Sequence, residues 1–231
     1  KLTMFIIDPL YLLFAVPGLL LALWAQYRVK SAFNRGSQIA PRSGVTGELA
    51  AQAILDQAGL THVSIERTQG FLSDHYDPRH KVLRLSPDVH DGRSLAALGV
   101  AAHEAGHAIQ DAQNYSPLVL RNAIVPMASF GSMASYLILI GGLIMSWSPL
   151  VLLAVLLFSA VVVFQLVNLP CEFNASSRAR EALQSVGLVT SSEDPEVGKV
   201  LNAAALTYVA GVVSALLMLA YYVIMYLGMR E

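Results

Sequence analysis

Residues 95–109 read LAALGVAAHEAGHAI, an apolar run that is interrupted only by His103, Glu104 and His107. On an α-helix the two histidines lie one turn apart on the same face, so their rings can converge on one ion. Glu104 is the next residue around the helix, where its carboxylate can reach a water on that ion without being a ligand. At about 15 residues the run is shorter than the 18 or more that usually cross a membrane. It predicts a buried helix of a domain seated on the membrane, with shallow insertion into the bilayer as the alternative.

The polar residues of this helix favour a metal site over a helix face with two solvent-facing histidines. Buried polar groups without partners cost free energy, and a metal ion with its water provides a partner for each imidazole and for the carboxylate. Zinc lowers the pKa of a bound water from about 16 to about 7. Glu104 then takes the proton, and the hydroxide attacks a carbonyl, which is peptide hydrolysis. Zinc is favoured over iron because this spacing suits an open tetrahedral site.

The composition is that of a membrane protein with a modest water-facing part. The 231 residues are 55% hydrophobic and only 13% charged, whereas soluble domains carry about 25% charged residues. The mean hydropathy is +0.55. A net charge of −1 gives no reason to expect a nucleic-acid partner. Cys171 is the single cysteine, which excludes an internal disulfide.

Four apolar segments are long enough to cross the hydrocarbon core, which takes about 20 apolar residues. Their bounds are residues 9–26, 124–145, 149–169 and 206–228. Because only residues 146–148 separate the second from the third, these two form a tight helical hairpin, 124–169. The first segment lacks the charged start and small-residue cleavage site of a signal peptide, so we expect a retained anchor.

Two polar regions lie between the spans, at residues 27–123 and 170–205. Capping and turn residues place Ser94 at the start of the histidine-bearing helix and a turn at Asp77-Pro78. The other predicted elements are helices over 46–58 and 178–184, a strand over 62–67 and a hairpin over 71–86.

Basic residues predict the side of the membrane on which the histidines lie. Four of them follow the first span, namely Arg28, Lys30, Arg35 and Arg42. The positive-inside rule places such a cluster in the cytoplasm. Since the hairpin leaves and returns, residues 170–205 lie on the same side as His103 and His107.

A catalytic zinc site has three protein ligands, so a third is needed on that side. Glu172 fits, because it follows Pro170 at the end of the third span. The alternative is a carboxylate at a helix start, stabilised there by the helix dipole. Other candidates for the third ligand are upstream histidines: His62, His75, His80 and His90.

Three stretches resemble a known family: 72–78 (LSDHYDP), 101–110 (AAHEAGHAIQ) and 172–179 (EFNASSRA). They are similar to the bacterial multi-pass membrane zinc metallopeptidases described as neutral zinc metallopeptidases. That family is distantly similar to the heat-shock membrane protease and CAAX prenyl endopeptidase group. The resemblance implies a gluzincin-like site, with one catalytic Zn²⁺ held by His103, His107 and Glu172 and with Glu104 as general base.

The resemblance also bears on residues around the ligands. In the prenyl endopeptidase group an aspartate four residues after the third ligand supports a zinc histidine. Here that position is Ser176, whose hydroxyl is a weaker partner than a carboxylate, and Asn174 is another candidate for the role.

Two further roles are expected around the zinc site. A developing oxyanion needs a hydrogen-bond donor opposite the metal, and each candidate donor has a purely structural role as its alternative. The candidates are Arg178, His75 and Tyr76.

Zincin folds present an edge strand before the metal helix, to which an extended peptide adds by main-chain hydrogen bonds. Lys81, Val82, Leu83, Arg84 and Leu85 are the candidate edge strand, with an ordinary strand of a small sheet as the alternative.

The expected fold is a membrane α-helical bundle of about four transmembrane helices with a small α+β zincin-like domain. The expected function is a zinc-dependent endopeptidase of the bacterial cell membrane, with its active site facing the cytoplasm. Its partners are then the lipid bilayer and a peptide or membrane-protein substrate. One alternative is a scaffold or chaperone-like membrane protein with a weak or inactive zinc site. The other is a site-2-type intramembrane protease, which requires the histidine motif inside a true span.

Overall fold

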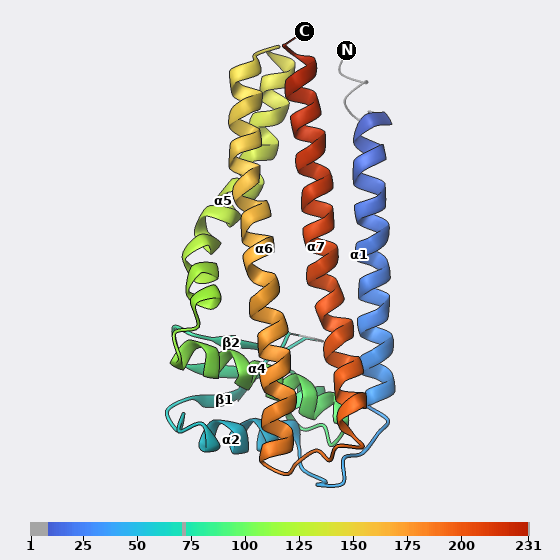
Figure 1. Ribbon diagram of the computed structural model, residues 1–231, viewed down its shortest axis with the longest axis vertical. Coiled ribbons are helices and arrows are strands. Elements are labelled where there is room, and N and C mark those ends of the chain that lie inside the picture. Colours follow the sequence, from blue (N-terminus) through green and yellow to red (C-terminus); the bar gives the residue numbers. More distant parts are fainter. Residues whose placement is uncertain (1–8, 71–72, 231) are drawn as a thin grey trace. The chain divides into compact units, whose positions relative to one another are not determined.

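The computed structural model describes residues 9–70 and 73–230 (Figure 1). Its elements in chain order are α1 (Pro9–Gly36), α2 (Gly47–Gln57), β1 (Ser64–Arg67), β2 (His75–Asp77), β3 (Val82–Leu85), α3 (Pro87–His90), α4 (Leu95–Ala112), α5 (Ser116–Ile144), α6 (Ser148–Ser185) and α7 (Asp194–Gly228). Within the described ranges, four helices are long and apolar enough to cross a membrane: α1, α5, α6 and α7. The protein is therefore a helical membrane bundle with a small α+β domain, as the sequence predicts.

The chain divides into two compact units. The first lies within segments Lys1–Ala25, Leu120–Leu169 and Thr207–Glu231, and the second within Gln26–Val119 and Pro170–Leu206. Each of α1, α5, α6 and α7 contributes to both units, because these helices run on beyond their apolar segments.

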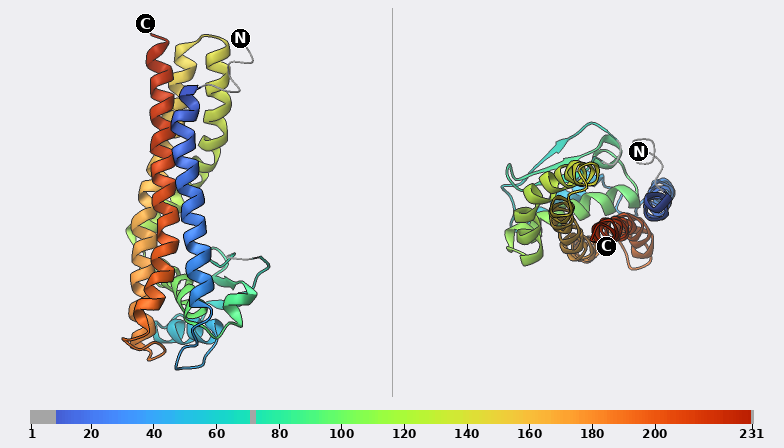
Figure 2. Two further views of the ribbon diagram at one scale, coloured as in Figure 1. Left: turned by 90° about the vertical axis from the view of Figure 1, so that its right-hand side faces the viewer. Right: turned by 90° about the horizontal axis from the view of Figure 1, so that it is seen from above.

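The first unit is a bundle in which α5, α6 and α7 run side by side (Figures 1 and 2). Its buried core is small and mixes aliphatic with aromatic side chains: Leu139, Val151, Ala154, Tyr221 and Tyr222. Large apolar side chains such as Phe130 and Met133 are about 70% exposed, which is typical of a lipid-facing surface. The predicted tight hairpin is confirmed, because α5 ends at Ile144 and α6 begins at Ser148.

The prediction of a third span that ends before a separate helix over 178–184 is wrong. Helix α6 continues without interruption from Ser148 to Ser185, with Pro170 inside it. A proline removes one backbone N–H from a helix and often bends it, but the remaining hydrogen bonds on both sides carry the helix onward. Glu172 therefore lies in the middle of a helix, and its interpretation as a helix-start carboxylate is wrong.

The second unit contains a three-stranded sheet in the order β1-β3-β2. Strand β3 pairs in parallel with β1 and antiparallel with β2, and Leu83 lies opposite both Ile65 and Tyr76. The prediction that residues 81–85 form an edge strand is therefore wrong. Val82, Leu83 and Leu85 are buried, and a buried strand needs hydrogen-bond partners along both edges. Within the described sheet, β1 and β2 are the edge strands.

Local signals in this unit agree with the structure. The Thr46 side chain accepts a hydrogen bond from the Leu49 N–H at the start of α2, and Ser94 caps α4 in the same way. The hairpin turns at the predicted place, where Asp77 Oδ1 accepts the backbone N–H groups of Arg79 and His80. Its predicted start at Phe71 lies outside the described residues.

The core of the second unit surrounds α4. Leu95, Leu98, Ala101, Ala102 and Ala105 are fully buried. They pack with residues of α2, β3, α6 and α7 in one continuous cluster. The second unit thereby holds the histidine-bearing helix in its interior, and the prediction of a buried helix from the apolar run is confirmed.

Candidate metal centre

Three side chains from two helices gather their ligand atoms at one point. His103 and His107 of α4 and Glu172 of α6 each offer an atom, and these atoms all lie within 4.8 Å of one another. The Glu172 Oε2 atom is 3.3 Å from His103 Nε2 and 3.6 Å from His107 Nε2. No other group of three or more histidine, cysteine or acidic residues with this geometry occurs among the described residues.

Small residues allow the two helices to approach closely enough for this arrangement. A Cβ atom placed on Gly106 of α4 would lie 2.8 Å from the backbone oxygen of Ala175 in α6. Ala102, Ala105, Ala175 and Ala179 are fully buried. Since backbone atoms of Ala175 occupy the space beside Gly106, a side chain at this position, between the two histidines, would push α4 and α6 apart.

The donor set fits a zinc ion. Ligand atoms about 2.0–2.2 Å from a tetrahedral zinc lie roughly 3.4 Å from one another, and the two distances to Glu172 are 3.3 and 3.6 Å. Glu172 is only 2% exposed, so its carboxylate needs a positive partner. Burial raises the pKa of Glu172, and its contacts with His103 and His107 lower the pKa. Together the contacts outweigh burial, so the pKa of Glu172 is below the ordinary value for a glutamate.

Each histidine has a second contact at its other ring nitrogen. The Nδ1 atom of His103 lies 3.2 Å from the Ser176 hydroxyl. The Nδ1 atom of His107 lies 3.0 Å from Oε1 of Gln110, a residue that is fully buried. These contacts leave both Nε2 atoms directed at Glu172, which is the arrangement that metal-binding histidines usually have. The expected position Ser176 is thus in place, whereas Gln110 was not anticipated.

Asn174, the other candidate for that role, does not contact a histidine directly. Its side-chain oxygen accepts hydrogen bonds from Gln110 Nε2 at 2.9 Å and from Arg178 Nε at 2.7 Å. Gln110, which contacts both residues, connects Asn174 with His107.

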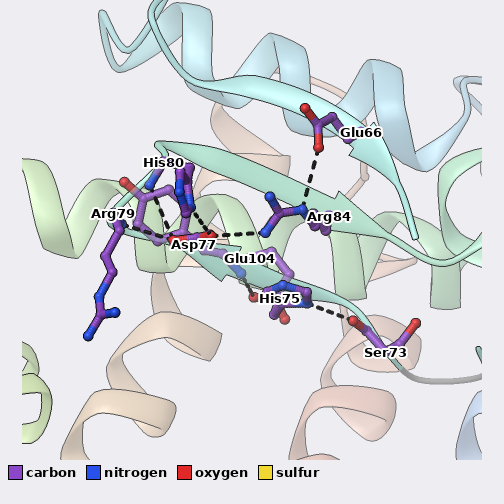
Figure 3. Close-up of polar contacts among 9 residues, drawn as sticks. Glu66, Ser73, His75, Asp77, Arg79, His80, Arg84 and Glu104 are labelled. Carbon is purple, nitrogen blue, oxygen red and sulfur yellow. Dashed lines mark hydrogen bonds and ion pairs between the residues drawn. The ribbon is translucent and has the colours of Figure 1, made fainter. Parts of the chain in front are cut away.

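Glu104 lies on α4 next to strand β2 (Figure 3). Its Oε2 atom accepts the backbone N–H of Tyr76 at 3.0 Å, and the residue is 8% exposed. Because the donor is a backbone N–H group, side-chain patterns along the chain do not indicate this contact. The contact fixes one carboxylate oxygen of Glu104 against the free edge of β2.

The three candidate oxyanion donors have different surroundings. The Tyr76 hydroxyl donates to Asp111 at 2.7 Å, and burial together with this hydrogen bond raises the pKa of the phenol. Arg178 donates to Asn174 and Gln113 and lies over the Tyr115 ring. Both groups are therefore engaged within the domain.

His75, the third candidate, is exposed on β2, and its Nδ1 lies 2.8 Å from the Ser73 carbonyl oxygen (Figure 3). A carbonyl oxygen only accepts hydrogen bonds, so Nδ1 carries a proton. The Nε2 atom of His75 then donates only when the ring is protonated.

The remaining histidines do not join the cluster. His80 contacts Asp77, and His90 contacts Asp91 and Glu48. His62 lies in the turn before β1. Of the candidates for the third ligand, only Glu172 lies within reach of both His103 and His107.

Ion pairs brace the strands beside Glu104. Arg84 of the central strand contacts Asp77 on one neighbouring strand and Glu66 on the other (Figure 3). Hydrogen bonds from His80 and Arg84 hold the pKa of Asp77 well below its ordinary value. Lys81 and Tyr76 both donate to Asp111 on α4, which connects the hairpin with the metal helix.

Comparison with known proteins identifies the family to which the chain belongs. The family described as "Putative neutral zinc metallopeptidase" matches residues 11–227. The chain belongs to this family. It is also 45% identical over 222 residues to "Putative membrane protease YugP" of Bacillus subtilis (strain 168), an alignment that covers 96% of this chain and 99% of the relative. No solved structure matches the chain.

Family membership and the four apolar helices support a zinc protease of the membrane. The family description implies zinc, and the trio of His103, His107 and Glu172 is the group in the described structure that could hold it.

Proposed function

We propose that this protein is a membrane-embedded zinc endopeptidase that hydrolyses peptide bonds at the trio of His103, His107 and Glu172. The observation that carries the proposal is the convergence of these three ligand atoms within 4.8 Å, next to a glutamate on the same helix. A zinc ion held there supplies Lewis acidity, which polarises a peptide carbonyl and makes a water easier to deprotonate.

Glu104 is proposed as the general base. Its Oε2 atom is held by the Tyr76 N–H, so the carboxylate has a fixed orientation and its other oxygen is left to accept the proton of the attacking water. The same carboxylate then delivers a proton to the leaving amine. A general base positioned in this way contributes roughly 10²-fold to 10⁴-fold to the rate.

His75 is the oxyanion donor that the surroundings favour. Tyr76 and Arg178 already donate to partners inside the domain, whereas His75 is exposed on the strand beside Glu104 (Figure 3). Its protonated ring would donate from Nε2 to the negative charge that develops on the substrate carbonyl.

The expected substrates are peptides or membrane proteins, and the site is proposed to face the cytoplasm. The basic cluster after the first apolar segment supports this orientation. The contact between His103 and Glu172 supports the expectation that both polar regions lie on one side. A site-2-type intramembrane mechanism is disfavoured, because α4 is not among the four candidate membrane spans in the described structure.

The deciding experiment compares the wild-type protein with Glu104→Gln in detergent, with elemental analysis of zinc and cleavage of an unstructured protein such as casein. The amide cannot accept the water's proton, so this variant should keep zinc and lose roughly 10²-fold or more of the rate. Glu181→Gln is the matched control, because Glu181 lies on α6 and contacts Ser177 rather than the trio.

The outcomes separate the candidate functions. Zinc in the wild type together with turnover that Glu104→Gln abolishes supports the peptidase. Zinc without turnover in any variant favours the scaffold or chaperone-like alternative. Equal turnover by wild type and Glu104→Gln would refute the assigned general base.

A further inference from the structure

We infer that Gln110 is a positioning residue that presets His107 and Glu172 for the metal through one directed hydrogen-bond network. The inference rests on the proposed function, because it concerns the same metal centre. Gln110 lies on α4 three residues after His107, is fully buried and uses both ends of its amide. Such a side chain cannot serve solubility or surface charge, so its contacts explain its presence in an apolar helix.

The contacts of Gln110 connect both metal-bearing helices. Its Oε1 atom lies 3.0 Å from His107 Nδ1. Its Nε2 atom donates to the backbone oxygen of Cys171 at 2.8 Å and to the Asn174 side-chain oxygen at 2.9 Å. Cys171 immediately precedes Glu172, and Asn174 follows it by two residues. One buried amide therefore holds a ligand of α4, the backbone just before the ligand of α6 and a side chain two residues after that ligand.

Groups with fixed roles determine the direction of every bond in this network. The Cys171 carbonyl oxygen only accepts hydrogen bonds, so it must face the NH₂ end of Gln110. Arg178 only donates, and its Nε atom is 2.7 Å from the Asn174 oxygen. Asn174 therefore presents its oxygen to Arg178 and to Gln110. Rotating either amide by 180° would bring two acceptors or two donors together.

The orientation of the Gln110 amide determines which ring nitrogen of His107 carries the proton. Because the amide oxygen of Gln110 faces Nδ1, the hydrogen on the neutral ring must lie on Nδ1. The Nε2 atom then carries the lone pair, and it is the atom that lies 3.6 Å from Glu172. His103 lacks such control, since the Ser176 hydroxyl beside its Nδ1 can either donate or accept.

The first test measures zinc affinity by competition with a chromophoric chelator for the full chain in detergent. Gln110→Met keeps the length and approximate volume of the side chain but removes every donor and acceptor. We expect zinc to bind about 10-fold to 100-fold more weakly, which is typical when the partner of a metal-binding histidine is lost. Gln52→Met is the control, because Gln52 is on α2 and contacts only Asp56 among its polar neighbours in the described structure.

The second test reads the ring directly and needs no metal. Nitrogen-15 NMR of the histidines in the zinc-free protein, at a pH where His107 is neutral, should show its proton on Nδ1. Gln110→Met should lose this preference. Asn174→Ala, which removes one of the two acceptors of the Gln110 amide, should weaken zinc binding less than Gln110→Met does.

Each result decides between the two proposals. A folded Gln110→Met protein that binds zinc as tightly as the wild type overturns the inference and leaves the metal centre intact. If Gln110→Met does not fold, a wild-type His107 with its proton on Nε2 overturns the inference instead. A wild-type protein that binds no zinc refutes the proposed function, whereas the zinc-free NMR measurement still tests the role of Gln110.

Discussion

Replacing Gly106 by alanine tests whether the close approach of α4 and α6 forms the metal centre. The new Cβ would lie 2.8 Å from the backbone oxygen of Ala175 and 3.4 Å from two other backbone atoms of that residue. Backbone atoms of a helix cannot rotate away. Restoring an ordinary contact of about 3.4 Å requires the helices to separate by about 0.6 Å.

Two effects of this substitution oppose each other in stability. Alanine favours a helix interior over glycine by about 1 kcal/mol, whereas overpacking a tight contact costs about 1–3 kcal/mol. The free energy of unfolding should therefore change by between about 0 and −2 kcal/mol. Zinc affinity should fall by about 10-fold or more, because ligand distances in a zinc site tolerate only about 0.2 Å.

Gly99→Ala is the matched control on the same helix. Its Cβ would meet a methyl group of Val197 at 3.1 Å, and a side-chain methyl can move where a backbone oxygen cannot. Thermal denaturation and chelator competition on both variants provide the measurement. If Gly106→Ala binds zinc like the wild type, or if Gly99→Ala weakens zinc equally, the reasoning from helix separation is refuted.

Three further predictions follow from the site and its surroundings. His103→Ala, His107→Ala and Glu172→Ala should each lower the zinc that remains after mild chelation, because each removes one of three ligands. In a Cys171→Ser background, single cysteines at Arg35, Trp147 and Ser192 should be labelled by an impermeant reagent on intact cells only at position 147. The low pKa of Asp77, caused by hydrogen bonds from His80 and Arg84, stabilises the fold above the unfolded pKa of about 3.9, and this contribution is lost as pH falls toward the folded pKa. Asp77→Asn should therefore lower the Tm at neutral pH and approach the wild-type Tm in acid.

Each of these predictions has a contradicting result. Full zinc content in Glu172→Ala would remove Glu172 from the ligand set. Labelling at positions 35 and 192 but not at 147 would invert the orientation. Labelling at 35 without 192 would place the two polar regions on opposite sides of the membrane. If the Tm difference between Asp77→Asn and the wild type stays constant from neutral pH into acid, the low pKa of Asp77 does not stabilise the hairpin.

Local signals made much of the fold accessible from the sequence. Apolar length indicates the four long helices, and Thr46 and Ser94 begin their helices because their side chains accept backbone N–H groups there. The spacing of the histidines predicts that they share one helix face, and Glu172 is expected on the same side of the membrane. The structure brings these three side chains together.

Features that depend on non-local pairing were less accessible. Whether residues 81–85 lie at an edge or in the centre depends on where β1 pairs, and strand alternation carries no information on that. Pro170 indicates a helix boundary in the sequence, but the backbone hydrogen bonds on both sides of it carry α6 onward, and Ala179 and Leu183 beyond it are buried in the core. Gln110 did leave a signal, since a polar side chain three residues after His107 shares its helix face.

The separation of the ligands along the chain has a consequence for folding. His103 and Glu172 are 69 residues apart in sequence, and the protein has a single cysteine, so a bound ion would act as the cross-link that a disulfide provides elsewhere. By the chain-entropy relation, closing a loop of this length restricts the unfolded chain by about 4 kcal/mol. Resistance to heat and denaturant would then rise with free zinc concentration. A metal-starved cell would in that case hold a looser, more easily degraded protein as well as a less active one.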